Sequence, residues 1–162
     1  RLGKIIPGKS HSSRIKPGKF HTDHASQEAL GVNGYSREAW KDAPEMYEAI
    51  EIVQKIWPTE SKEKLIPVGW NIWFDIGFIK YNLFSLDRLF YHHPIDLMSV
   101  FWILWFDNVE ERPSLSKYYR CMFDEEMPEA HTAEGDVMGC LKLYQTAVSD
   151  FQNVEKIIGK RK

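Results

Sequence analysis

The chain has 162 residues, which is enough for one domain with a buried core. It is 43% hydrophobic, 27% charged and 14% aromatic, values that fit a globular protein and argue against a disordered one. The net charge of −2 conceals an uneven distribution, because residues 1–19 hold six Lys/Arg and no acid while residues 20–150 hold 22 acids and 11 bases. Two interpretations stay open: the basic ends contact phosphates around a cation-binding centre, or they are simply solvated.

Cysteine usage and hydropathy indicate the cellular compartment of the protein. Cys121 and Cys140 show no metal-binding or redox spacing, and no secretory leader is present, so we expect an intracellular, cytoplasmic protein with reduced thiols. The longest apolar run, residues 95–106, is interrupted by Asp96 and Ser99 and is far shorter than the ~20 residues of a membrane span. The sequence therefore predicts no membrane association.

The first half of the chain predicts one hairpin, three helices and one strand. Pro-Gly pairs within residues 1–20 predict a hairpin with a basic turn. Helical patterns follow over residues 23–30 and, with Pro44 at the start and Pro58 at the end, over residues 44–57. Residues 65–68 predict a buried strand that leads into a helix over residues 71–82.

The second half is predicted to be mostly helical. A buried helix is expected over residues 97–106, a second helix with Ser114 as N-cap, and a long last helix from Gly135 or Asp136 to Val154. The apolar positions expected on its buried face are Val137, Leu141, Tyr144, Val148 and Phe151. Few strands among many helices predict an α/β fold, in which helices cover a sheet, and a single domain over residues 1–162.

The first candidate for chemistry is Asn71-Ile72-Trp73-Phe74-Asp75, directly after the predicted strand. Asn71 and Asp75 are four residues apart, so on a helix they would share a face near its positive end. Asp75 could hold a cation there, or it could be an ordinary capping acid.

The second candidate surrounds the start of the last helix, where His131 precedes Asp136 by five residues. A loop histidine ahead of a helix-borne carboxylate suits a general base beside a metal ligand. The alternative is a surface histidine and a carboxylate that interacts only with the helix dipole.

Taken together, N-x-x-F-D and the later H-x-x-x-x-D resemble the motifs of the DEDDh exonucleases, the family of proofreading subunits and RNase T-like enzymes. The resemblance covers most of residues 15–150 and implies a ribonuclease H-like mixed sheet flanked by helices. It implies that Asp75 and Asp136 bind metal, that His131 is the general base and that Asn71 lies near the terminal nucleotide or the metal shell. The implied activity is removal of nucleotides from single-stranded DNA or RNA 3′ ends with two Mg²⁺ or Mn²⁺ ions.

The chain departs from this family in one respect. The family's D-x-E motif, on its first strand, has no counterpart ahead of Ile15. Either about twenty residues precede Arg1 in the complete protein, or the domain is a catalytically inactive, nuclease-like module that binds nucleic acid or protein. A polymerase or another protein partner fits the resemblance, which leaves the substrate, DNA or RNA, and the oligomeric state open.

Overall fold

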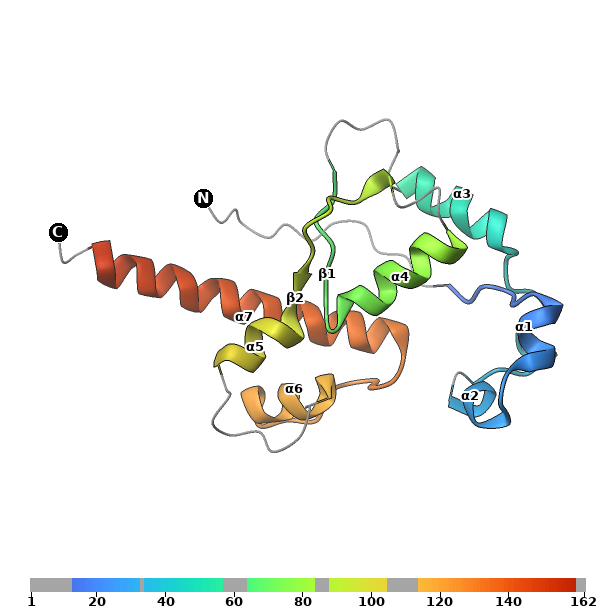
Figure 1. Cartoon of the computed structure of the whole chain (residues 1–162). Helices are drawn as coiled ribbons and strands as arrows, with labels where there is room; N and C mark the ends of the chain where they lie inside the picture. The colour runs from blue at the N-terminus through green and yellow to red at the C-terminus, as the bar shows by residue number, and fades with distance from the viewer. Residues whose placement is uncertain (1–12, 33, 57–63, 84–87, 105–113, 160–162) are drawn as a thin grey trace. The chain divides into compact units, whose positions relative to one another are not determined.

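The computed structural model describes residues 13–32, 34–56, 64–83, 88–104 and 114–159 (Figure 1). Most of these residues are helical. The elements, in chain order, are α1 (Lys19–His24), α2 (Gln27–Val32), α3 (Met46–Ile56), β1 (Val68–Gly69), α4 (Ile72–Asn82), β2 (Ile95–Asp96), α5 (Leu97–Leu104), α6 (Leu115–Phe123) and α7 (Ala133–Gly159).

A short parallel sheet joins two distant parts of the sequence. β1 pairs with β2, with Val68 opposite Ile95 and Gly69 opposite Asp96. An isolated parallel bridge between Leu65 and Phe90 lies ahead of this pair. The predicted α/β class is therefore confirmed as a mixed α/β fold, mostly helical, with a two-stranded parallel sheet in the described residues.

The described chain divides into two compact units, and the boundary falls inside α4. The first unit contains residues 65–77, 90–104 and 114–159, and the second contains residues 13–32, 34–56, 64, 78–83 and 88–89. Each unit has its own hydrophobic cluster. That residues 1–162 form a single domain stays a prediction.

The core of the first unit lies where α7 packs against α5, α6 and β1. Leu97, Phe101 and Leu143 are almost completely buried, and burial of such side chains stabilises a fold by roughly 1.5–3 kcal/mol each. The hydroxyl of Tyr118 in α6 donates to the carbonyl of Phe101 at 3.2 Å, so this buried polar group has a partner.

The core of the second unit forms around Leu83 and Leu89, which pack against Met46, Ile50 and Val53 of α3. The last three residues belong to the apolar stripe that predicts this helix, so the prediction of a helix here is confirmed. Trp57 and Pro58, which we expected to end it, lie outside the described residues.

The N-terminal segment differs from its prediction where it is described. Residues 13–18 form no strand, and Lys19–His24 form α1, which the sequence pattern did not predict. The other half of the expected hairpin lies outside the described residues. The Pro17-Gly18 pair directly precedes this helix.

The buried face of α7 differs in part from the predicted one, although Tyr144 packs against the core as expected. Leu143, which is fully buried, lies at its centre with Cys140, Tyr144 and Ala147, whereas Val137 is 65% exposed. The physical reason is the close approach of α7 to residues 127–129. That approach brings the face carrying Gly135 and Gly139 inward. The prediction that Val137 faces the core is wrong.

Within the described residues, no helix is both long enough and apolar enough to cross a membrane.

A polar cluster on the surface links α6 to α7. The ammonium of Lys142 in α7 donates to the Glu125 carboxylate and, at 3.0 Å, to the Tyr119 hydroxyl, which itself donates to Glu125 at 2.9 Å. The same ammonium lies 4.1 Å from the centre of the Phe123 ring. Hydrogen bonds from Lys142 and then Tyr119 lower the pKa of Glu125, and the bond to Glu125 raises the pKa of Lys142.

These shifts predict a pH-dependent contribution to stability. Because the pKa of Glu125 is lower in the folded state, its contribution is present above the ordinary carboxyl pKa of about 4.3 and is lost as the pH falls through the lowered value. Glu125→Gln should therefore reduce the loss of stability between about pH 5 and pH 3, measured by urea unfolding at several pH values. An unchanged acid dependence in this variant would contradict the assignment.

Candidate functional site

Asp75 and Asp136 occupy equivalent places at the starts of two helices of the first unit. Each is the fourth residue of its helix, α4 for Asp75 and α7 for Asp136, where the helix dipole favours negative charge. α4 follows the carboxyl end of β1, and α7 packs against β1. Ligands bind preferentially at the carboxyl ends of the strands of open parallel sheets, so Asp75 starts from a favourable position.

Asn71 lies ahead of α4 and not inside its first turn. Its φ of 53° is left-handed, a conformation that asparagine tolerates better than most residues, and α4 begins at Ile72. The shared helix face predicted for Asn71 and Asp75 is therefore not formed. The backbone N–H of Asn71 donates to the Asp96 carboxylate at 2.9 Å, so backbone geometry fixes the turn between β1 and α4.

Asp96 is the residue that holds this turn in place. It ends β2, and its carboxylate accepts hydrogen bonds from the backbone N–H of Met98 at 3.2 Å and from the hydroxyl of Ser99 at 2.6 Å, as an N-cap of α5 does. The third bond, from Asn71, ties the start of α4 to the start of α5. Asp96 thus positions Asn71 and, four residues on, Asp75.

We expect Asp96→Ala to destabilise the chain by about 1–2 kcal/mol, because the α5 cap and the bond to Asn71 are both lost. Urea unfolding measures this free energy. Asp96→Asn is the matched control: it keeps one carbonyl acceptor and should lose less. Equal loss in the two variants would show that charge, not hydrogen bonding, is the role of Asp96.

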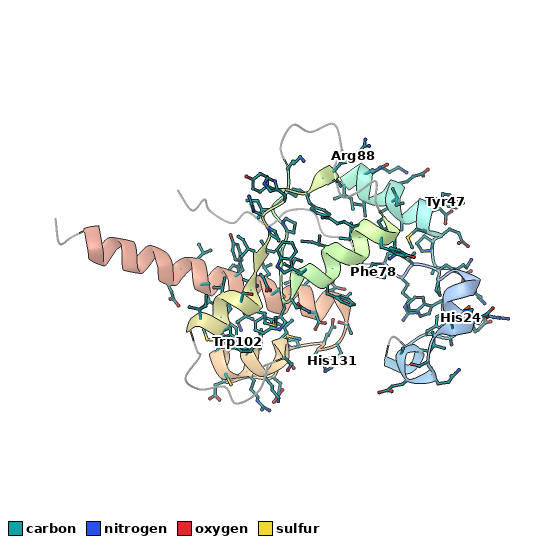
Figure 2. The ribbon with its side chains drawn as sticks, viewed as in Figure 1. His24, Tyr47, Phe78, Arg88, Trp102 and His131 are labelled. Atoms are coloured by element: carbon teal, nitrogen blue, oxygen red, sulfur yellow. The ribbon has the colours of Figure 1, made fainter. Side chains whose placement is uncertain are left out.

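His131 lies in a tight loop between α6 and α7 and is exposed (Figure 2). Its φ of 70° is left-handed, as is that of Glu129 at 51°. The Thr132 hydroxyl caps α7 by accepting from the N–H of Gly135 at 3.0 Å and donates to the carbonyl of Glu129 at 2.8 Å. The Asp136 carboxylate accepts from the backbone N–H of His131 at 3.3 Å. His131 and Asp136, paired in the sequence motif, are therefore also joined in the structure.

Two glycines allow this loop to pack closely on α7. A Cβ at Gly135 would lie 2.2 Å from the carbonyl oxygen of Glu129 and 2.8 Å from that of Pro128. A Cβ at Gly139, one turn further, would lie 2.5 Å from the sulfur of Met127. The conformation of the His131 loop thus depends on the absence of side chains at Gly135 and Gly139.

Cys140 lies one turn beyond Asp136 on α7, and acids from both candidate motifs affect its thiol. Burial raises the pKa of its thiol above the ordinary range, the carboxylates of Asp136 and Asp75 raise it further, and a hydrogen bond with the Trp70 backbone lowers it. Both carboxylates are therefore close enough to act electrostatically on a single sulfur.

Asp75 itself is in an environment that disfavours its charge. Although the residue as a whole is exposed, its carboxyl group is partly surrounded, and this burial raises its pKa, while a hydrogen bond from its own backbone N–H lowers it. Among the described residues, no lysine or arginine forms an ion pair with Asp75 or Asp136. A bound cation would relieve the cost of keeping these two carboxylates charged.

A divalent cation needs several oxygen ligands close together. No three His, Cys, Asp or Glu side chains in the described ranges lie close enough together to hold a metal ion. Mg²⁺, however, is commonly held by one or two carboxylates together with waters and substrate phosphates. Asp75 and Asp136 have the carboxylate chemistry that such an ion prefers, and no third ligand lies close enough among the described residues.

The sequence motifs thus locate Asn71, Asp75, His131 and Asp136, but they do not assign the roles of Asp96 and Cys140. Asp96 follows an apolar strand and precedes an apolar helix, which is the only signal that could have marked it as a cap. Comparison of the chain with protein-family models and with curated proteins finds no match.

Proposed function

We propose that the protein is a metal-dependent 3′-to-5′ exonuclease that acts on single-stranded DNA or RNA. The observation that carries the proposal is that the carboxylates of Asp75 and Asp136, one from each motif, both act electrostatically on the Cys140 thiol. The same family resemblance extends the proposal to a ribonuclease H-like fold, for which the parallel pair of β1 and β2 with covering helices is a partial counterpart.

Each motif residue has a role in this proposal. Asp75 and Asp136 hold the divalent cation, and Asn71 lies beside the terminal nucleotide. His131, exposed in its loop, accepts the proton of the attacking water, a role that histidine commonly has in general base catalysis. When bound, Mg²⁺ or Mn²⁺ would neutralise the charge that develops on the attacking and leaving oxygens of the phosphodiester.

A complete site in this family contains two ions and a D-x-E motif. The proposal therefore requires carboxylates in addition to Asp75 and Asp136 to hold the second ion. The partner it names is a single-stranded 3′ end.

The test uses the complete protein with oligonucleotides labelled at either end. In the presence of Mg²⁺ or Mn²⁺, we expect label at the 3′ end to be released first as mononucleotide, while a 5′ label remains on a ladder of shortened products. EDTA should stop the reaction. Release from the 5′ end, or no release at all with either metal, would overturn the proposal.

A second candidate function is a catalytically inactive domain of the same type that binds nucleic acid or protein. It is favoured by the absence of a third metal ligand among the described residues. If this candidate is correct, the same oligonucleotides bind to the protein in a salt-dependent manner and are not hydrolysed when metal is added.

A further inference from the structure

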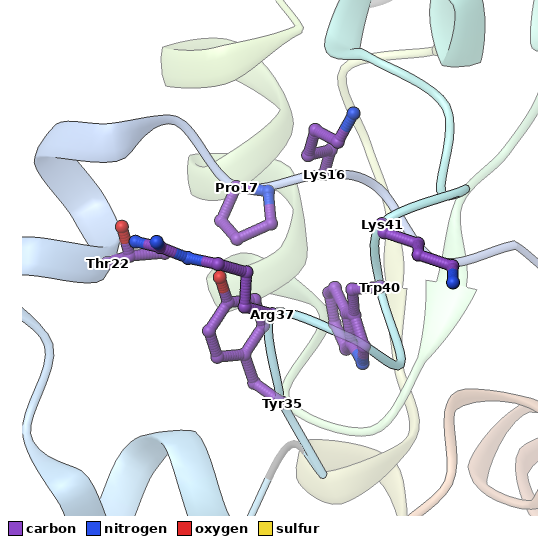
Figure 3. Close-up of a pocket in the computed structure, with 7 residues that line it drawn as sticks. All are labelled: Lys16, Pro17, Thr22, Tyr35, Arg37, Trp40 and Lys41. Atoms are coloured by element: carbon purple, nitrogen blue, oxygen red, sulfur yellow. The ribbon is translucent and has the colours of Figure 1, made fainter.

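The second unit contains a pocket of about 310 Å³, which the proposed exonuclease site does not include (Figure 3). This volume lies at the lower end of the ~300–1,000 Å³ range of small-molecule sites. Its walls combine aromatic and cationic side chains with a proline, namely Tyr35, Trp40, Lys16, Arg37, Lys41 and Pro17.

The aromatic wall is held in place by its own backbone. Tyr35 and Trp40 meet edge to face, with their ring centres 5.4 Å apart. The indole N–H of Trp40 donates to the carbonyl of Gly34 at 3.2 Å, and its backbone N–H donates to the carbonyl of Ser36 at 3.1 Å. Because the turn that carries these rings is hydrogen-bonded within itself, the wall is formed before any ligand arrives.

The opposite wall of the pocket, formed by Lys16 and Pro17, is bonded to Pro44 and Glu45, which follow Trp40 in the chain. The backbone N–H of Lys16, next to Pro17, donates to the carbonyl of Pro44 at 2.8 Å, and its ammonium pairs with Glu45 at 3.1 Å. Figure 3 shows Lys16 and Pro17 on one side of the pocket, facing the side that carries Tyr35 and Arg37.

Cationic groups surround this pocket, and one of them is available for an anion. Lys16 and Lys41 pair with Glu45 and Glu38, respectively, in ion pairs that are largely exposed. Within the described ranges, no acidic side chain pairs with Arg37. The Arg14 guanidinium lies over the Trp40 ring, 5.6 Å from its centre, and adds positive charge beside the pocket. Arg37 is thus the group best placed to bind a phosphate, bidentately, as guanidinium groups do.

We propose that this pocket binds a nucleotide, with the base against Tyr35 and Trp40 and the phosphate on Arg37. Aromatic faces stack on any base, and a guanidinium forks onto a phosphate, so the two kinds of wall together match a base joined to a phosphate. A free mononucleotide and one nucleotide of a single strand share this chemistry. The inference is independent of hydrolysis by the first unit, because binding here requires no divalent cation.

The test is calorimetric titration of the full chain, in EDTA, with a mononucleotide, the corresponding nucleoside, ribose 5-phosphate and a short oligonucleotide of the same base. We expect the mononucleotide or the oligonucleotide to bind about tenfold or more tightly than the nucleoside and ribose 5-phosphate. Binding of the mononucleotide identifies the free nucleotide as a ligand; binding of the oligonucleotide alone identifies a nucleotide within a strand.

Variants locate the binding to the pocket. Arg37→Gln should weaken it about tenfold, and Arg88→Gln, an exposed arginine of the same unit outside the pocket, should not change it. The indole N–H signal of Trp40 in an NMR spectrum, assigned with Trp40→Phe, should shift on titration. No binding of either nucleotide form, or equal affinity in Arg37→Gln and the wild type, would overturn the proposal.

Discussion

Replacing Asp136 by asparagine is expected to abolish metal-dependent cleavage while leaving the fold intact. Asparagine keeps a carbonyl oxygen that can accept the hydrogen bond from the backbone N–H of His131, so the loop ahead of α7 is preserved. It removes the negative charge that a hard divalent cation requires. We expect the rate of 3′-end release to fall about 100-fold or more, which corresponds to about 2.7 kcal/mol of transition-state stabilisation.

The matched control is Asp150→Asn, because Asp150 is an exposed residue of the same helix, away from the His131 loop. This variant should cleave at the wild-type rate. Urea unfolding of both variants separates loss of chemistry from loss of fold. Wild-type rates in Asp136→Asn would show that the cation is bound elsewhere.

Replacing Gly135 by alanine should have the largest effect on stability of the changes considered. The added Cβ would come within 2.2 Å of the Glu129 carbonyl oxygen and 2.8 Å of the Pro128 carbonyl oxygen, and both are backbone atoms that can move only with the loop. We expect a loss of about 2–3 kcal/mol in the free energy of unfolding. The His131 loop would be displaced, so metal-dependent cleavage should fall as well.

Gly77 provides the control for this substitution, since it lies in α4 and a Cβ there would meet nothing within 4 Å. Alanine is the better helix former, so Gly77→Ala should raise the free energy of unfolding by about 0.5–1 kcal/mol. The two glycine-to-alanine changes therefore have opposite expected signs in the same urea experiment. A Gly135→Ala variant as stable as Gly77→Ala would contradict the close packing of the loop on α7.

The sequence predicted those helices whose ends carry local signals. Ser114 accepts from the N–H of Lys117 and caps α6 as its residue type predicts, and Asp124 ends the same helix in a left-handed conformation. The apolar stripe of α3 likewise predicted a helix that the structure contains. Capping and periodicity are properties of neighbouring residues, so no knowledge of the rest of the chain was needed.

The buried face of α7 could not be predicted in this way. The face that turns inward depends on the loop that packs against it. Gly135 and Gly139, which lack side chains, allow this loop to approach the helix on their face. Leu143 lies on the same face as these glycines and is buried in the core, while Val137 is left exposed. A hydrophobic pattern cannot register a contact that is made by the absence of a side chain.

The candidate site shows the same division between local and tertiary information. Residue type and spacing led to Asp75, His131 and Asp136, but the role of Asp96 arises only because β1 and β2 pair and bring Asn71 beside it. Cys140 acquires its meaning from the two carboxylates that act on it. The pocket of Arg37 and Trp40 was not predicted either, because its walls come from turns whose conformation no periodic pattern specifies.

In the proposed exonuclease, Asp75 and Asp136 hold one and the same cation. This shared binding is tested most directly by counting free Mn²⁺ with electron paramagnetic resonance during titration of the wild type, Asp75→Asn, Asp136→Asn and the double variant. If both carboxylates bind one ion, each single change should weaken that binding about tenfold or more, and the double variant should be little weaker than either single one. Effects that simply add in the double variant, or unchanged binding in both single variants, would contradict the shared site.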